Sequence, residues 1–312
     1  MKGTYIGLKL DKAGVVAKFG NTIVTAETIS ELLLTLYEGF NHGTYTVPDD
    51  KTITYNVYGY NEFSGHLFQE IGENIDFSIN DIFETVKILG YNNAEIKFCH
   101  AQQGPTFLFA KEHGEYNPNV YISNVSFYND TPKATAWEGC YFRFHVGYNG
   151  TLSIDNCLFL ENGLQLQYGV TNSIINCQFN SINSSRYALW VGKNAFGKGY
   201  TDTLQDVTID NCTFTGYRGI KILTDTKTTS TYVVEPRDNQ SINIQNCVFK
   251  DITNKAAVVI DCQLADRSSF TTGESKLKIK NTTFVNCAVG NIIIDEDSKD
   301  KKIQYLISNE VV

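Results

Sequence analysis

Three aspartates recur at nearly constant distances from a phenylalanine and are well suited to acid–base chemistry. Asp225, Asp261 and Asp295 follow the phenylalanines of their own repeat units by 11, 12 and 11 residues. If the units stack like neighbouring strands, adjacent carboxylates would lie about 5 Å apart and alternate ones about 10 Å apart. These separations bracket those of retaining and inverting glycoside hydrolases, and crowding raises one carboxyl pKa, as a general acid requires. The carboxylates could instead bind Ca²⁺ as a cofactor, since hard cations take several carboxylate oxygens, or each could simply begin a turn.

Basic residues offer a different chemistry, the proton abstraction that a polysaccharide lyase performs beside a carboxylate. Two pairs are spaced for it, Arg143 with His145 and Arg218 with Lys221. The alternative for each is a solvated surface position. Amides and aromatic rings in the same segments would suit a hydroxyl-rich ligand. These candidate ligand-binding residues are Tyr141, Gln165, Gln167, Tyr168, Trp190 and Arg218.

A repeated corner motif predicts the elements that would position these residues. An apolar-alternating segment is followed by Asn, a small residue, any residue and Phe, as in SIDNCLF (153–159) and TIDNCTF (208–214). Asn tolerates left-handed backbone angles, so each Asn is expected to bend the chain between two short strands. The successive asparagines are 32, 20, 35, 35 and 35 residues apart. They are Asn124, Asn156, Asn176, Asn211, Asn246 and Asn281.

The repeated bend predicts a stacked coil, with an asparagine ladder at the corner and a phenylalanine column inside. A spacing of 20 residues fits one turn of the coil, and the longer spacings add a loop of about a dozen residues. Alternation turns the amide and basic candidates outward from the third strand of each coil, into a groove walled by the loops. The direction of Trp190 stays open. The third strands are expected in TFLFA (106–110), CYFRFHV (140–146), LQLQY (164–168), YALWVG (187–192), GIKIL (219–223), AAVVI (256–260) and NIIID (291–295).

The Asn-Cys-x-Phe corner resembles the repeats of the pectin-lyase-like proteins over about residues 40 to 300. The resemblance implies an all-β fold, a single-stranded right-handed parallel β-helix. It leaves function open, because lyases, glycosidases, epimerases, adhesins and phage tailspikes share the scaffold. Arg218-Gly219-Ile220-Lys221 is similar to the R-I-K motif of the polygalacturonase branch but contains an inserted glycine. The N-T-D and G-H-G motifs of that branch and the W-x-D-H signature of pectate lyases are absent, so a pectinase is not expected.

Residues 1–40 are expected to form an N-terminal segment with a capping helix, and residues 41–312 the β-helix domain. Thr28 and Glu31 form a capping-box pattern, and Gly39 is expected to end the helix. Such a helix would cover the open apolar end of the first coil. The segments 52–61 and 85–98 are expected to be early coils. The C-terminal segment 303–312 would either close the coil as a last strand or leave that end to a partner chain.

Cysteines follow four of the corner asparagines, and the same place is taken by Val or Thr in flanking coils. A position shared by these three types is a small inward slot, so reduced core thiols are expected. No C-x-x-C pair indicates zinc, and no metal centre is predicted. The residues in this slot are Val125, Cys157, Cys177, Cys212, Cys247 and Thr282.

Composition narrows the class of function. The net charge of −8 over 312 residues argues against a general nucleic-acid binder and against adsorption to anionic lipid. No apolar run reaches the about 20 residues of a membrane span. Met1 to Phe19 lack a secretory signal, so the chain is expected to act without secretion or to have lost a leader.

We expect a glycan-recognising protein of a virion or extracellular surface, a homotrimeric module of the tailspike or fibre type. A rigid rod with an irregular loop wall would bind cell-surface glycan at little ordering cost, and depolymerase activity is left open. One alternative is a polysaccharide lyase or glycoside hydrolase acting on acidic polysaccharide. Another is a purely architectural rod of a capsid or envelope.

Overall fold

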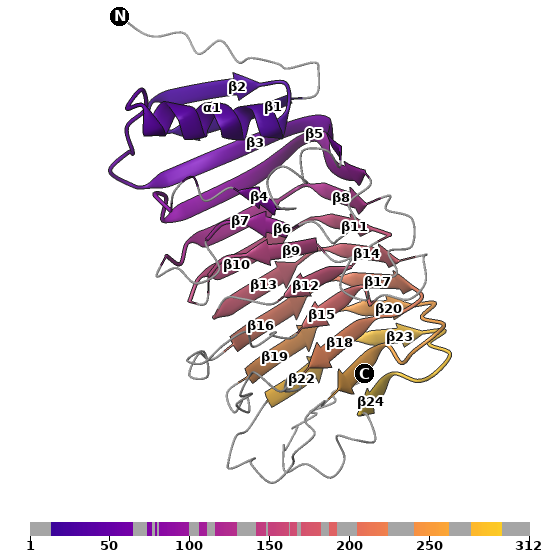
Figure 1. The fold of residues 1–312 in the computed structure, drawn as a ribbon. Coiled ribbons are helices and arrows are strands. Elements are labelled where there is room, and N and C mark those ends of the chain that lie inside the picture. Colours follow the sequence, from indigo (N-terminus) through magenta and orange to yellow (C-terminus); the bar gives the residue numbers. More distant parts are fainter. Residues whose placement is uncertain are drawn as a thin grey trace, which may run out of the picture.

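The chain winds into a parallel β-helix with a short helix at its N-terminal end, as the repeat predicts (Figure 1). The structure is a computed structural model. It describes residues 14–64, 74–76, 79, 81–99, 106–110, 116–129, 142–147, 149–161, 163–166, 170–181, 187–191, 205–223, 240–261 and 276–294.

Each regular coil contributes three strands, which pair in parallel with the strands of the coils before and after it. First strands are β7 (Asn119–Ser123), β10 (Thr151–Asp155), β13 (Thr171–Ile175), β16 (Gln205–Asp210), β19 (Gln240–Gln245) and β22 (Lys276–Lys280). Second strands, after the corner, are β8 (Ser126–Asn129), β11 (Leu158–Leu160), β14 (Gln178–Ser181), β17 (Thr213–Gly216), β20 (Val248–Lys250) and β23 (Thr283–Val285).

Third strands form a separate eight-stranded sheet. They are β4 (Asn74–Asp76), β6 (Thr106–Leu108), β9 (Phe142–His145), β12 (Leu164–Leu166), β15 (Leu189–Val191), β18 (Ile220–Leu223), β21 (Val258–Asp261) and β24 (Ile292–Ile294). All seven segments expected to supply third strands do so, and β4 is an addition. The early coils are also confirmed, as β3 (Thr52–Ser64) and β5 (Thr85–Cys99), each a single strand that continues through the corner with a register shift between Tyr58 and Tyr60.

Every corner asparagine of the motif has a left-handed backbone, with φ between 47° and 58°. The side chains link successive coils: Asn156 Nδ2 donates to Asn124 Oδ1 at 2.7 Å, and Asn211 Nδ2 to Asn176 Oδ1 at 2.7 Å. The ladder is not continuous, however. Asn176 donates to the Asp155 carboxylate at 2.8 Å, because a carboxylate is a stronger acceptor than the amide oxygen beside it. Asp210 interrupts the ladder at Asn246 in the same way.

A column of parallel phenylalanine rings fills the interior of the coil, as expected. Successive ring centroids lie 4.7–5.2 Å apart, and the ring planes differ by 5–13°. Isolated aromatic pairs prefer offset or edge-on contacts. The in-register coils hold the rings parallel, because their strands repeat at nearly the same spacing. The rings belong to Phe127, Phe159, Phe179, Phe214, Phe249 and Phe284.

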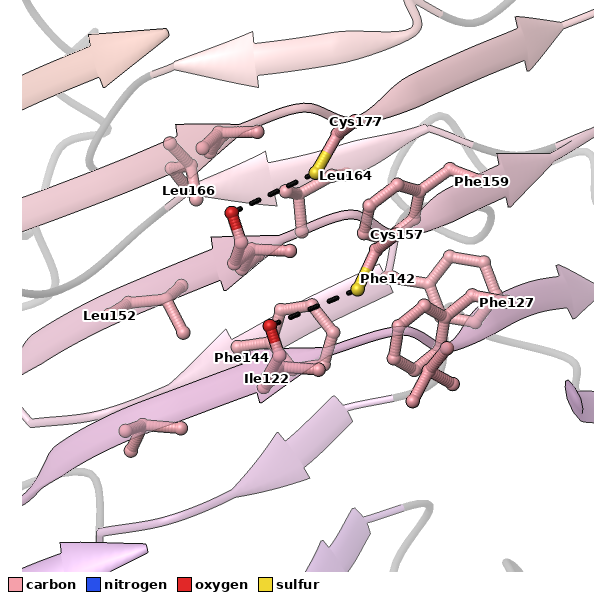
Figure 2. Close-up of a cluster of buried hydrophobic side chains, with 14 of the residues drawn as sticks. Ile122, Phe127, Phe142, Phe144, Leu152, Cys157, Phe159, Leu164, Leu166 and Cys177 are labelled. Atoms are coloured by element: carbon pink, nitrogen blue, oxygen red, sulfur yellow. Dashed lines mark hydrogen bonds between the residues drawn. The ribbon is translucent and has the colours of Figure 1, made fainter. Parts of the chain in front are cut away.

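The cysteines after the corner asparagines are buried free thiols, as predicted. Figure 2 shows Cys157 and Cys177 pointing into the core beside Phe127 and Phe159. Each thiol lies near an isoleucine carbonyl oxygen of the preceding coil: Cys157 Sγ is 3.9 Å from Ile122 O. These contacts are long and weak, as expected of a thiol that packs as a small buried hydrophobic group.

The N-terminal end is built differently from the coils. β1 (Gly14–Phe19) and β2 (Thr22–Ala26) form an antiparallel hairpin, and β1 also pairs antiparallel with β3. Helix α1 (Ile29–Asn41) packs its buried face, Ile29, Leu32 and Leu36, against the hairpin. The sequence analysis missed the hairpin, although Gly20-Asn21 between two apolar-alternating runs is a hairpin signal.

Two details of α1 differ from expectation. Thr28 Oγ1 accepts from Glu31 N at 3.2 Å, but Glu31 Oε2 accepts from Glu27 N, one residue before the position that a full capping box uses. The helix also continues past Gly39 to Asn41. Gly39 serves packing instead, because a Cβ there would lie 2.2 Å from the ring of Tyr45.

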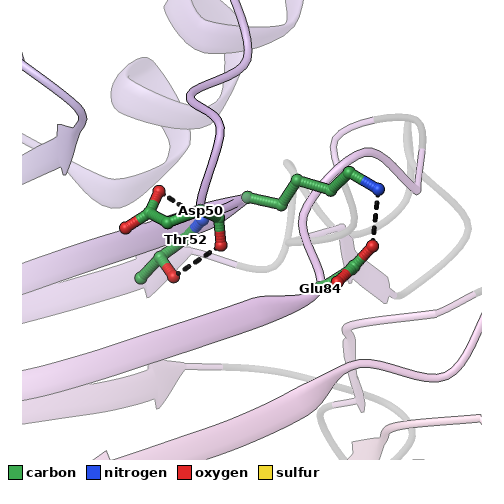
Figure 3. Close-up of polar contacts among 4 residues, drawn as sticks. Asp50, Thr52 and Glu84 are labelled. Atoms are coloured by element: carbon green, nitrogen blue, oxygen red, sulfur yellow. Dashed lines mark hydrogen bonds and ion pairs between the residues drawn. The ribbon is translucent and has the colours of Figure 1, made fainter.

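A polar turn starts the first coil (Figure 3). The Asp50 carboxylate accepts from Thr52 N at 3.2 Å, and Lys51 between them has a left-handed φ of 45°. The ammonium of Lys51 pairs with the carboxylate of Glu84, which directly precedes β5. Both side chains are more than half exposed, so the ion pair itself contributes less than about 1 kcal/mol.

Candidate ligand-binding face

The outer face of the eight-stranded sheet aligns four of the candidate residues. Across neighbouring strands, Arg143 lies opposite Gln165, Gln165 opposite Trp190, and Trp190 opposite Lys221. Their neighbours along each strand, such as Leu189 on β15, point into the core. The four positions therefore form one column along the axis of the coil, on the side that alternation predicts.

Two members of this column are not open to solvent. Gln165 is 1% exposed and Trp190 5% exposed. The expectation that Gln165 faces solvent was wrong in this respect, since the side chain leaves the core but is covered. The indole ring of Trp190 likewise offers no open face for a sugar to stack on.

The amide of Gln165 has no hydrogen-bond partner for either Oε1 or Nε2 in the described part of the chain. An unsatisfied buried polar group costs about 1–3 kcal/mol. Such a group in a native structure calls for a ligand, a water molecule or a functional role. Gln165 is therefore the member of the column whose chemistry is least explained by the fold.

Two cations, Lys221 of this column and Arg218 beside it, contact aromatic rings. The guanidinium carbon of Arg218 lies 5.3 Å from the ring centroid of Tyr187 and 5.6 Å from that of Tyr217. Lys221 Nζ lies 5.8 Å from the centroid of Tyr187 and 5.6 Å from that of Trp190. Tyr187 thus contacts both cations. Cation–π contacts of this kind contribute about 0.5–2 kcal/mol each and hold long side chains in place.

Asn254 fixes the orientation of Arg218 from the next coil. Its Oδ1 accepts from Arg218 Nε at 2.9 Å, and its Nδ2 donates to the hydroxyl of Tyr217 at 2.6 Å. Because Tyr217 accepts here, its own O–H can donate elsewhere. Gly219 permits the close stacking of the two coils, since a Cβ there would lie 2.1 Å from Ala257 O. This explains the glycine inserted in the R-I-K-like motif.

Sequence reasoning missed three members of this group, Tyr187, Tyr217 and Asn254. Tyr217 and Asn254 lie in the turns between second and third strands, outside the periodic segments on which the analysis relied. Tyr187 lies just before β15. A signal was present for Tyr217, which directly precedes the candidate Arg218. We call the six residues Tyr187, Trp190, Tyr217, Arg218, Lys221 and Asn254 the cation–aromatic cluster.

The register corrects the expected alignment of the aspartates. Asp261, at the end of β21, lies opposite Leu223, two residues before Asp225. The turn before β21 is longer than the turn before β18. Nearly equal distances from the phenylalanine therefore do not place Asp225 and Asp261 at equivalent positions of their strands. Asp295 follows Ile294, which lies opposite Ile260, so its place in sequence does correspond to that of Asp261.

Several candidates lie outside the described residues: Tyr141, Gln167, Tyr168, Asp225 and Asp295. For Arg143, His145 and Asp261 the structure describes the backbone position alone. Their predicted roles in catalysis or binding remain predictions, and so does the Ca²⁺ site. Over the residues that are described, no group of three or more His, Cys, Asp or Glu side chains is arranged to hold a metal ion.

Within the same residues, no helix has the length and apolar character needed to cross a membrane. Comparisons of the chain with protein-family models, with curated proteins and with solved structures give no match.

Proposed function

We propose that the protein recognises a glycan on the outer face of its eight-stranded sheet. The observation that carries the proposal is the cation–aromatic cluster, in which Arg218 and Lys221 share the ring of Tyr187. Both cations are partly exposed, whereas the rings of Tyr187 and Trp190 beneath them are at least nine-tenths buried. The buried rings thus serve as supports, and the cationic heads are the groups that a ligand would meet.

The chemistry of the cluster favours a hydroxyl-rich ligand that carries acidic groups. A guanidinium held by Asn254 presents a fixed set of donors, which suits a carboxylate or sulfate. The hydroxyl of Tyr217 adds a neutral donor beside the guanidinium of Arg218. A polysaccharide running along the coil axis would meet these groups in turn.

The rigid scaffold favours binding of a ligand without a conformational change of the protein. Strands paired in register on both sides hold each side chain in one position, so little ordering cost accompanies weak sugar contacts. A receptor-binding module of a virion or cell surface, of the tailspike or fibre type, is the setting that we propose for such a site. Membership of the pectin-lyase-like group is part of the same proposal.

A polysaccharide lyase is the second candidate, because Arg218 and Lys221 lie together on one ring. Arg218 would neutralise the uronate carboxylate, while Lys221, acting as the neutral amine, would take the adjacent proton and return it to the leaving sugar oxygen. The leaving sugar oxygen would depart as the double bond formed. Such a reaction would produce an absorbing unsaturated uronate, and recognition alone would not.

Binding of the full chain to a panel of acidic and neutral oligosaccharides tests the proposal. We expect Lys221→Met and Arg218→Ala to weaken binding at least tenfold, about 1.4 kcal/mol. Lys250→Met is the matched control, because Lys250 is an exposed lysine on β20, a second strand and so outside the eight-stranded sheet. The absence of binding across the panel, or equal binding by Lys221→Met and the wild type, would refute the site. Absorbance of unsaturated products would favour the lyase.

A further inference from the structure

We propose that the edge strand β2 pairs with β2 of a second copy of this chain. In the described residues β2 hydrogen-bonds to β1 alone, and it ends the sheet order β3-β1-β2. An edge strand presents unpaired backbone N–H and C=O groups, which make it a template for another strand. Figure 1 shows β2 at the N-terminal limit of the β-helix.

The large sheet ends at β2, β22 and β23, and the first two differ in how they are protected. At the far end, β22 has the sequence KLKIK, and Lys278 and Lys280 are exposed. Lysines on an edge strand discourage pairing with another chain. β2 has the sequence TIVTA, with no charged residue and no proline, and its register with β1 runs without a bulge. Compared with β22, β2 is therefore the edge that lacks charged protection against a partner strand.

The hairpin geometry defines which backbone groups point outward. Phe19 and Thr22 close a two-residue turn, in which Gly20 has a φ of 51°. The closing pair of such a hairpin exchanges hydrogen bonds, and the bonding alternates from there along the strands. Thr22, Val24 and Ala26 therefore bond toward β1. Ile23 and Thr25 turn their N–H and C=O groups to the open edge.

This pattern is complementary to itself. In an antiparallel pair with a twofold axis at Val24, Ile23 of one copy lies opposite Thr25 of the other. These are the residues with outward backbone groups, so each such pair exchanges both of its hydrogen bonds. The contact uses the same surface on both copies, as closed dimers do.

The side chains at this end also favour a covered state. Ile23 is 60% exposed, and α1, packed beside the hairpin, exposes Leu34 by 59% and Tyr37 by 49%. Burial of apolar surface stabilises association by roughly 25 cal/mol for each Å² removed from water. Because β2 is uncharged, two copies can approach along this edge without facing like charges within the strand.

Self-pairing of one edge closes at two copies. The homotrimer predicted from the sequence would need a different surface, so mass in solution separates the two assemblies. Light scattering on the eluting full chain should give twice the chain mass of 35.0 kDa. A mass of one or three chains at micromolar concentration would overturn the proposal.

Two variants test whether the contact between the copies lies at β2. Thr25→Pro removes an outward N–H while leaving the bonds to β1, so we expect at least a tenfold weaker dimer with an unchanged circular dichroism spectrum. Ile23→Lys introduces the edge protection that β22 already has, and the same weakening is expected. Val289→Lys is the control, because Val289 is an exposed valine near the C-terminal end of the described chain. If Thr25→Pro fails to fold, Ile23→Lys decides, and a dimer that Ile23→Lys leaves intact contradicts the proposal.

Discussion

The inside and the outside of the eight-stranded sheet differ sharply at the same coils. Facing inward, equivalent positions carry similar side chains, as with Leu164 on β12, Leu189 on β15 and Ile220 on β18. One residue further along, the equivalent outward positions are occupied by Gln165, Trp190 and Lys221, which share no chemistry. The backbone is in register throughout, so the fold does not require these differences.

This contrast separates the inward residues, which stabilise the coil, from the outward residues, which vary without affecting the fold. An inward residue packs against the equivalent residue of the preceding coil and of the following coil, so a substitution there disturbs two packing contacts. Outward positions of the third strands meet no such constraint. We therefore expect large stability effects and no specific binding effect from the inner columns, and the reverse from the cation–aromatic cluster.

The largest effect is expected at the centre of the phenylalanine column. Phe214 is fully buried, with ring centroids 4.8 Å from Phe179 and 4.7 Å from Phe249. Phe214→Ala should lower the free energy of unfolding by about 3–5 kcal/mol in a denaturant titration. Phe284→Ala, at the partly buried last ring of the column, should cost less. Equal losses at both positions would contradict the view that stacking on two sides matters.

A medium effect is expected at the corner. Asn211 combines a φ of 51° with a 2.7 Å hydrogen bond from Nδ2 to Asn176 Oδ1. Asn211→Ala should cost about 1–3 kcal/mol, from left-handed strain and the lost hydrogen bond. Asn211→Gly keeps the backbone conformation and loses only the hydrogen bond, so it should cost less than half as much. The comparison fails if glycine and alanine prove equally destabilising in thermal unfolding.

The effect expected in the cysteine column is smallest at neutral pH and grows only in alkaline solution. The hydrogen bond with the Cys177 thiol, followed by burial, raises the pKa of Cys212 to about 12. An unfolded thiol loses its proton above about pH 8.5, whereas the folded one keeps it. The folded state then binds more protons, so stability should fall between about pH 9 and 12, by up to about 1.4 kcal/mol per pH unit.

Cys212→Val isolates this contribution, because Val125 occupies the same slot in another coil. The variant should unfold with nearly wild-type stability at pH 7 and with a shallower decline above pH 9. Denaturant titrations across that range measure the difference. An unchanged slope would show that Cys212 keeps its ordinary pKa in the folded chain.

The columns of asparagine, cysteine and phenylalanine could be predicted because each repeats the same residue type at the same place in successive coils, and this repetition is visible in the sequence. The corner asparagine and the phenylalanine, such as Asn156 and Phe159, are three residues apart in every copy of the motif. The left-handed φ of the asparagine and the stacking of the phenylalanine rings follow from that constant spacing. A second corner escaped notice because its residues vary. Asp251 and Asn286 both have left-handed φ, of 55° and 53°, and Asn286 Nδ2 donates to Asp251 Oδ1 at 2.9 Å.

The candidate site could be predicted only in part. Alternation along the strand placed Gln165 and Lys221 on the correct face, since a side-chain period of two is fixed by the backbone. It could not show that Gln165 is covered, because burial depends on neighbours far apart in sequence. It also could not align Asp225 with Asp261, because the turn before each third strand varies in length. The N-terminal hairpin occurs only once in the described chain, so no repeated sequence pattern indicated it.

The three consecutive spacings of 35 residues between Asn176 and Asn281 have a consequence for how this rod can change length. Removing residues 177–211 would join Asn176 directly to Cys212 and recreate every inner contact with the next coil. Each such excision or duplication would shorten or extend the rod by about 4.8 Å. A gene that encodes it can therefore change the length of the rod in steps of one whole layer.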